Sequence, residues 1–313
     1  MRLGDLGEFG LIARIERAAA KLPRSRAVVL GIGDDAAVLR PRPGEDLVVT
    51  TDSLVENVHF RWRTQSARNV GRRALVANLS DLAAMGARPL GFTLALVAPP
   101  ELAVRSLDGL VAGLLYEARE HACPLVGGNV SRGGETSLGI TATGAVERGR
   151  ALSRRGARAG DRILVTGALG AAALDLARGE LGRGRVRRVP TPRLRAGRAL
   201  ARLSGVGGCI DISDGLEADL SHLVEGTGLA PELDPARLPL PPRFRSACAR
   251  LGLDPERLAR TGGEDYELLF SLRPAGPSAA ALCRRLGVRV SQIGRLVRAG
   301  RTRDGSQGGW RHF

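Results

Sequence analysis

Residues 47–60 read LVVTTDSLVENVHF, a stretch that joins an apolar run to a set of polar side chains. Residues 47–51 are apolar or β-branched, which is the composition that favours a strand. Asp52 follows directly, so a carboxylate stands where we expect that strand to end. The stretch therefore predicts a β-strand that carries an acidic group at its end.

Similar apolar runs on both sides of this stretch alternate with helical patterns, which predicts a mixed α/β domain. Apolar residues at three- and four-residue spacings predict helices over residues 67–85 and 102–121. Further strands are expected at residues 28–32, 36–39, 91–97 and 138–146.

Residues 147–161, ERGRALSRRGARAGD, are polar and rich in Arg and Gly, so we place a domain boundary there, between domains 1–148 and 149–313. The second domain continues in the same style. We expect strands at residues 162–166, 229–233, 266–272 and 288–296, and a further short strand that ends at residue 212. We expect helices at residues 171–178, 191–203, 216–225, 243–251 and 278–286. The fold class is therefore α/β (α+β) in two domains.

The composition is that of a globular protein, since 313 residues suffice for two domains that each bury a core. The sequence has no apolar stretch of membrane-spanning length and no signal-peptide pattern, so we expect a cytoplasmic protein without membrane partners. The four cysteines are far apart and form no CxxC pair, so we expect buried thiols rather than a zinc site or disulfides.

The net charge of +15 raises nucleic-acid binding as a function. We expect no nucleic-acid partner, because aromatic residues make up only 3% and no nucleic-acid fold motif occurs. Lys21 is the single lysine, so the basic bias is an arginine bias along the whole chain. An arginine-rich nucleic-acid binder remains an alternative.

Acidic residues cluster beside glycine or small polar residues in five segments. These acids are Asp34, Asp35, Asp52, Asp81, Asp211, Asp214, Glu264 and Asp265. Each one alone is more typical of a turn or a helix cap than of a ligand, but together they are hard oxygen ligands of the type that suits Mg²⁺ with substrate phosphates. No Walker A sequence occurs, so we expect a bound nucleotide to be held by metal ions and arginines.

The five segments resemble the thiamine-phosphate kinase family, within the superfamily of aminoimidazole ribonucleotide synthetase and selenophosphate synthetase. GIGDDAAV (31–38), TTDSLVENVHF (50–60), NLSDLAAMGA (78–87), DISDGL (211–216) and TGGEDYELLF (261–270) occur in the family's order, and GGWRHF (308–313) resembles its terminal motif. The VENVHF and GGEDYE segments point to the thiamine branch.

The resemblance implies a two-domain aminoimidazole ribonucleotide synthetase-like fold, a homodimer paired through the amino-terminal domains, and ATP and several Mg²⁺ ions in a cleft between the domains. It also implies roles for individual residues. The metal set is Asp35, Thr50, Thr51, Asp52, Asp81, Asn129, Asp211 and Asp214; ATP would contact Gly128, Arg154 and Ser213; thiamine phosphate would contact His59, Glu264 and Trp310. For Asp34 and Asp265, a direct role and a capping role are both open.

One segment departs from the family, which commonly has GGDT where this chain has Gly127-Gly128-Asn129-Val130. Asn129 keeps an oxygen ligand but lacks the negative charge, so we expect one metal ion to bind more weakly.

The implied reaction needs no general base, because a phosphate monoester with a second pKa of about 6 is already largely anionic at neutral pH. We therefore expect direct in-line transfer to give thiamine diphosphate, with catalysis by positioning and charge neutralisation. A superfamily enzyme with another acceptor and a non-catalytic nucleotide sensor remain alternatives.

Overall fold

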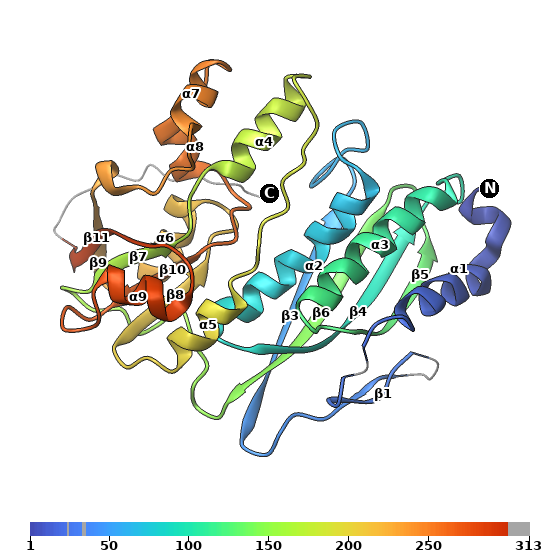
Figure 1. Cartoon of the computed structure of the whole chain (residues 1–313), viewed down its shortest axis with the longest axis horizontal. Helices are drawn as coiled ribbons and strands as arrows, with labels where there is room; N and C mark the ends of the chain where they lie inside the picture. The colour runs from blue at the N-terminus through green and yellow to red at the C-terminus, as the bar shows by residue number, and fades with distance from the viewer. Residues whose placement is uncertain (24, 33–35, 300–313) are drawn as a thin grey trace. The chain divides into compact units, whose positions relative to one another are not determined.

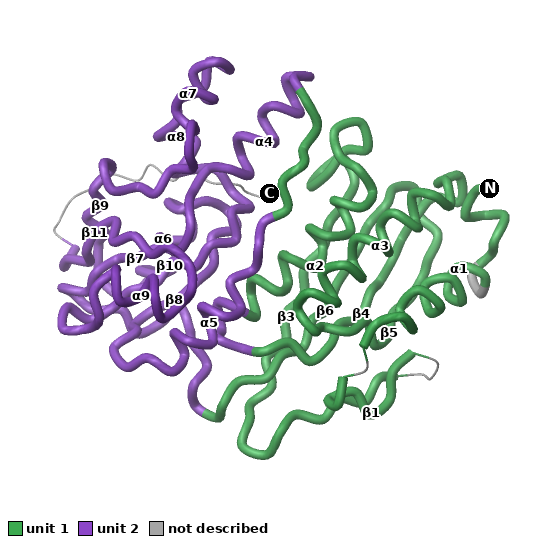
Figure 2. Tube along the Cα trace, in the orientation of Figure 1, with its two compact units in different colours: residues 1–82, 88–148, 184–189 green, residues 83–87, 149–183, 190–313 purple. Residues whose placement is uncertain are grey.

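The computed structural model describes residues 1–23, 25–32 and 36–299, and the chain divides into two compact units (Figure 2). The first unit comprises residues 1–82, 88–148 and 184–189, and the second comprises 83–87, 149–183 and the chain from residue 190 onward. Residues 83–87 therefore belong to the second unit, although the chain on both sides of them belongs to the first. Residues 184–189 belong to the first unit, although the chain on both sides of them belongs to the second.

The first unit is built on a four-stranded sheet in the order β3-β6-β4-β5. Its elements are α1 (Leu3–Ala19), β1 (Val28–Leu30), β2 (Val38–Leu39), β3 (Glu45–Val55), α2 (Ala67–Ala84), β4 (Arg88–Ala98), α3 (Val104–Glu120), β5 (Leu125–Arg132) and β6 (Ser137–Glu147). β4 and β5 are parallel and are joined by α3, whereas β6 pairs antiparallel with both β3 and β4. β1 and β2 form a separate antiparallel pair.

Helices α2 and α3 lie across one face of this sheet (Figure 1). Thr50 of β3 points to that face, because its hydroxyl contacts Asp81 of α2. Side chains alternate along a strand, so Leu47 and Val49 point to the opposite face, where they are 54% and 64% exposed. The sheet thus has one covered face and, along β3, an apolar face open to solvent.

Glycines allow α2 and α3 to approach very closely. A Cβ atom built at Gly71 would lie 2.0 Å from the carbonyl oxygen of Leu110, and one at Gly113 would lie 2.0 Å from that of Arg68. No side chain fits between the two backbones at these points, so the helix crossing requires glycine on both helices.

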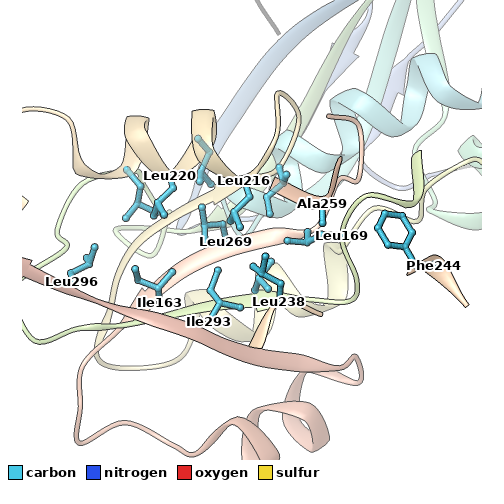
Figure 3. Packing of buried hydrophobic residues seen from close by; sticks show 14 of the residues in the cluster. Ile163, Leu169, Leu216, Leu220, Leu238, Phe244, Ala259, Leu269, Ile293 and Leu296 are labelled. Atoms are coloured by element: carbon cyan, nitrogen blue, oxygen red, sulfur yellow. The ribbon is translucent and has the colours of Figure 1, made fainter. Parts of the chain in front are cut away.

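The second unit contains a five-stranded sheet in the order β8-β10-β7-β11-β9, with every pair antiparallel. Its elements are β7 (Arg162–Thr166), α4 (Ala171–Glu180), α5 (Leu194–Ala201), β8 (Val206–Asp211), α6 (Leu216–Val224), β9 (Leu229–Leu233), a 3₁₀ turn (Pro235–Arg237), α7 (Phe244–Ala249), α8 (Pro255–Thr261), β10 (Leu268–Leu272), α9 (Ala279–Leu286) and β11 (Val290–Arg298). Figure 3 shows Leu216 and Leu220 of α6 over Leu269 of β10 in its buried core.

The predicted mixed α/β class is confirmed, but one strand, two α-helices and the short 3₁₀ turn were missed. β5 reads LVGGNVSR, in which two glycines and several polar residues weaken the strand signal. α1 contains three glycines, and Gly7 has the non-helical angles φ 64° and ψ 174°. α8 is only seven residues long. Within the described part of the chain, no helix has the length and apolarity needed to cross a membrane.

We predict that Gly113→Ala destabilises the protein by about 2 kcal/mol or more, because overpacking against a backbone carbonyl outweighs the gain of about 1 kcal/mol in helix propensity. Urea unfolding of parent and variant measures the difference. Gly134→Ala is the matched control, since a Cβ atom there meets nothing within 4 Å and the φ angle is not positive. Equal unfolding midpoints for Gly113→Ala and the parent would contradict the packing argument.

Candidate active site

In the first unit, the structure brings together Thr50 of β3 and Asp81 of α2. The Thr50 hydroxyl donates a hydrogen bond to Oδ2 of Asp81 at 2.5 Å. Asp52 lies two residues further along β3, hence on the same face of the strand as Thr50, and is exposed. Oxygen donors from a strand and a helix thus gather at the edge of the sheet.

Thr51 points to the other face of β3. Its hydroxyl donates to the carbonyl oxygen of Ile140 at 3.1 Å and accepts a hydrogen bond from Thr141 at 3.2 Å. The structure therefore separates the side chain of Thr51 from those of Thr50 and Asp52.

Gly128 and Asn129 lie on β5, at the opposite edge of the sheet from β3. Two strands stand between these edges, so the three strand spacings separate β3 from β5 by about 14 Å. The exposed Asn129 donates through Nδ2 to Oγ of Ser131 at 3.0 Å. Asn129 and Val130 also line two hollows beside α1, of about 70 and 490 Å³. Within one chain, the sheet does not bring Asn129 next to Asp52.

His59 lies in the turn after β3, and its ring accepts a hydrogen bond at Nδ1 from the backbone N–H of Val55 at 3.0 Å. The neutral ring therefore carries its proton on Nε2. The carbonyl oxygen of His59 accepts from the guanidinium of Arg73, a buried residue of α2 that also donates to Gln65. The sequence analysis did not single out Arg73. A charged residue inside an apolar helical pattern nevertheless indicates a buried polar contact of this kind.

In the second unit, β8 ends at Asp211, and the loop that follows carries Ser213 and Asp214. Asp219 on α6 accepts hydrogen bonds at one oxygen, Oδ2, from the backbone N–H groups of residues 213, 214 and 215 at 3.0, 3.1 and 3.1 Å. Burial raises the pKa of the Asp219 carboxyl to about 7; the nearby Asp214 adds to this rise and the three N–H groups oppose it.

Sequence reasoning also missed Asp219. Its signal is its position in the helix, where it falls on the same stripe as the buried Leu216, Leu220 and Leu223. An acidic residue on the apolar stripe of a helix predicts a buried polar contact.

The segment 263–267 pairs with this loop through its backbone. Glu264 donates its N–H to the carbonyl oxygen of Ser213 at 2.7 Å, and Tyr266 donates to that of Ile212 at 2.9 Å. Glu264 and Tyr266 have φ angles of 62° and 51°, which are uncommon for residues other than glycine. At Gly263, a Cβ atom would lie 2.4 Å from the Ser213 carbonyl oxygen. Glu264 therefore lies beside the loop that carries Ser213 and Asp214.

The other two acids of this segment support the fold. Asp265 is buried and caps α4, because its carboxylate accepts hydrogen bonds from the backbone N–H groups of Gly170 at 2.5 Å and Ala172 at 3.2 Å. Glu267 is buried too, and it accepts from Thr166 at 2.7 Å and from Arg193 at 2.5 and 2.6 Å. For Asp265, the capping role is the one that the structure displays.

Four further residues singled out in the sequence remain, one described by the structure and three not. Arg154 is exposed, and its backbone lies against β8, since a Cβ atom at Gly208 would be 2.7 Å from the Arg154 carbonyl oxygen. Asp35 and Trp310 lie outside the described residues, as does Asp34.

The oxygen donors of the first unit fit magnesium. Across residues 1–23, 25–32 and 36–299, no three His, Cys, Asp or Glu side chains converge to hold a metal ion by themselves. Mg²⁺ needs fewer protein ligands than that, because it takes one or two carboxylates together with water and substrate phosphates. Thr50, Asp52 and Asp81 offer donors of that kind.

Comparisons with known proteins agree with this fold. The family described as AIR synthase related protein, N-terminal domain, matches residues 33–146. The crystal structure of thiamine-monophosphate kinase from Stenotrophomonas maltophilia K279a is 38% identical, with a TM-score of 0.81 over 94% of this chain and 95% of that one. The solved complex of AaThiL with AMPPCP and TMP is 30% identical, with a TM-score of 0.75 over 100% and 99%.

A curated relative extends this similarity. The thiamine-monophosphate kinase of Haemophilus influenzae is 35% identical over 302 residues, which cover 93% of this chain and 89% of the relative. Identity at this level runs through both units rather than through the amino-terminal domain alone. The chain belongs to the thiamine-monophosphate kinase family.

Proposed function

We propose that this protein transfers the γ-phosphoryl group of ATP to thiamine monophosphate and yields thiamine diphosphate and ADP. The observation that carries the proposal is similarity along the whole chain, at 30% identity and a TM-score of 0.75, to a protein solved with AMPPCP and TMP. A phosphate oxygen of the acceptor bonds to the γ-phosphorus, while the bond from that phosphorus to the β,γ-bridging oxygen breaks and leaves its electron pair on ADP.

The main obstacle to this reaction is repulsion between two anionic phosphates, so catalysis consists of positioning and charge neutralisation. We propose that Mg²⁺ supplies the neutralising charge when bound, held by Asp35, Thr50, Asp52 and Asp81, by Asp211 and Asp214, and by Asn129. The expected ligand Thr51 is left out of this set, because its hydroxyl points to the other face of β3. The contact between Thr50 and Asp81 supports part of this set, because the hydroxyl fixes the orientation of the carboxylate.

The remaining proposed roles concern the two substrates. Gly128, Arg154 and Ser213 contact ATP, and His59, Glu264 and Trp310 contact thiamine monophosphate. The hydrogen bond from Val55 to Nδ1 of His59 supports this role, because the Nε2–H of the neutral ring is a donor suited to a phosphate oxygen. Glu264 is an acid suited to the cationic thiazolium. The domain division 1–148 and 149–313 and a cytoplasmic location belong to the same proposal.

We further propose that the protein is a homodimer paired through the first unit. Leu47 and Val49 support this, because they leave apolar side chains exposed on the open face of β3. The sheet order supports it as well: Asp52 and Asn129 belong to opposite edges, about 14 Å apart by strand spacing, so one metal ion cannot bind both within a single chain. In the proposed dimer, Asn129 of one copy serves the metal set of the other.

The proposed activity predicts that the purified protein with Mg²⁺ and ATP forms thiamine diphosphate and ADP in equal amounts. Asp81→Asn should lower turnover by at least about 100-fold, since removing even the partners of metal ligands costs about 10–100-fold. Asp108→Asn is the control, because it removes only a half-exposed ion pair with Arg14 in α1, away from Asp81. Turnover of a different acceptor, or ATP binding without any turnover, would reject the proposed reaction.

For Asn129 we predict that Asn129→Asp restores a ligand charge and lowers the Mg²⁺ concentration for half-maximal activity by about tenfold, equivalent to about 1.4 kcal/mol. Ser131→Asp adds the same charge two residues away and should leave the magnesium dependence unchanged. Unchanged dependence in Asn129→Asp would show that this position is not a ligand, and equal shifts in both variants would assign the effect to general charge.

The dimer can be tested on the open face of β3. We expect sedimentation to give twice the chain mass for the parent and the chain mass for Leu47→Glu/Val49→Glu, with turnover lost together with the dimer. Leu176→Glu is the matched control, since Leu176 is 45% exposed on α4 of the second unit. If the parent protein were monomeric and fully active, a metal site shared between two copies would be ruled out.

A further inference from the structure

One carboxylate holds the whole loop between β8 and α6. Oδ2 of Asp219 accepts the backbone N–H groups of three consecutive residues, Ser213, Asp214 and Gly215, and the side chain is only 2% exposed. Successive N–H groups that converge in this way at a helix N-terminus form an anion-binding nest. In other proteins such a nest takes a phosphate, but here the chain's own carboxylate fills it.

The filled nest limits how this loop can contact a nucleotide. The N–H group of Ser213 is used by Asp219, and its carbonyl oxygen accepts the N–H of Glu264 at 2.7 Å. The polar group of Ser213 that remains for ATP is its hydroxyl. Phosphate binding by the backbone of this loop would require Asp219 to leave its place.

The loop is also fixed from its other side. Gly215 has a φ angle of 113°, and a Cβ atom there would lie 2.8 Å from the backbone of Thr261. The loop is thus held between the Asp219 carboxylate and the segment that carries Glu264. The backbone from which Asp214 projects is therefore restrained by the three hydrogen bonds to Asp219 and by the contact of Gly215 with Thr261.

We propose that Asp219 is a positioning residue for phosphoryl transfer, because its carboxylate fills the amide nest of residues 213–215 and so orients Asp214 for magnesium. This inference rests on the proposed function of the loop. It assigns Asp219 no contact with substrate, so its effect must pass through the backbone of the loop.

Two substitutions of Asp219 distinguish the effect of its hydrogen-bond-accepting oxygen from the effect of its negative charge. Asp219→Ala removes the acceptor, and Asp219→Asn keeps one carbonyl oxygen, which is a weaker acceptor because it is neutral. We expect the Mg²⁺ concentration for half-maximal activity to rise by about 10–100-fold in Asp219→Ala and by less in Asp219→Asn, with the KM for thiamine monophosphate unchanged. Formate, which can occupy the vacated nest, should partly restore Asp219→Ala.

Two readouts do not depend on turnover. Hydrogen exchange of the amides of residues 213–215 should speed up in the order parent, Asp219→Asn, Asp219→Ala. Binding of Mn²⁺ without substrate, followed by electron paramagnetic resonance, should weaken in the same order. If the parent exchanges and binds Mn²⁺ as expected but lacks kinase activity, the proposed function fails while the assignment of Asp219 to the loop stands.

Asp254 provides the matched control. Its Oδ1 accepts the N–H groups of Glu256 at 2.9 Å and Arg257 at 3.2 Å and caps α8, but it is exposed. Asp254→Ala should reduce stability and leave both magnesium dependence and Mn²⁺ binding unchanged. The proposal would be overturned if Asp219→Ala had the same amide exchange rates and the same magnesium dependence as the parent protein. Should that variant fail to fold, the same parental values in Asp219→Asn would overturn it.

Discussion

The pairing of β10 with β8 is the interaction on which the candidate site of the second unit depends. β10 lies between β8 and β7 in the sheet, and its residues are fully buried. Past the ends of these strands, the hydrogen bonds from Tyr266 to Ile212 and from Glu264 to Ser213 continue the same pairing. Because the two loops extend paired core strands, this pairing fixes Ile212 and Ser213 from one side, while the Asp219 carboxylate holds residues 213–215 from the other. This support also explains how Glu264 and Tyr266 are kept at positive φ, which costs of order 1–3 kcal/mol each.

Acidic residues in these segments serve two different purposes. Asp219, Asp265 and Glu267 are buried, and each accepts hydrogen bonds from backbone N–H groups or from neighbouring side chains. A buried carboxylate is stable only with such partners, so these three acids are committed to the fold. The exposed Asp52 and the half-buried Asp81, Asp214 and Glu264 are more accessible, whereas Asp211, a member of the proposed metal set, is buried as well. Not every carboxylate in an acid-rich segment is therefore available to bind a metal ion or a substrate.

Much of the fold could be predicted from apolar periodicity. Residues 47–51, 91–97 and 138–146 lie within β3, β4 and β6, and the two long helices of the first unit are present. β5 and α1 could not be predicted, because glycine and polar residues obscure their periodicity, and their stability comes from packing in the folded unit.

The site was predictable as a set of residues but not as an arrangement. Nothing in the sequence indicates that Thr50 contacts a residue 31 positions away, that Thr51 turns to the opposite face, or that β5 lies at the far edge of the sheet. Those facts follow from strand order and side-chain alternation, which exist only in the folded chain. The individual roles of these residues and the domain boundary remain predictions.

Strand order in the second unit has a consequence for the time course of biosynthesis. β7, β8 and β9 have no sheet neighbours among the described strands except β10 and β11, which are the last strands to leave the ribosome. α4 likewise receives its cap from a residue 95 positions later. The first sheet has all four strands by residue 147, whereas three strands of the second sheet must wait with unpaired edges for residues 268–298. During that interval the nascent chain exposes unpaired strand edges, which are prone to aggregation, so we expect its need for chaperones to be greatest late in translation.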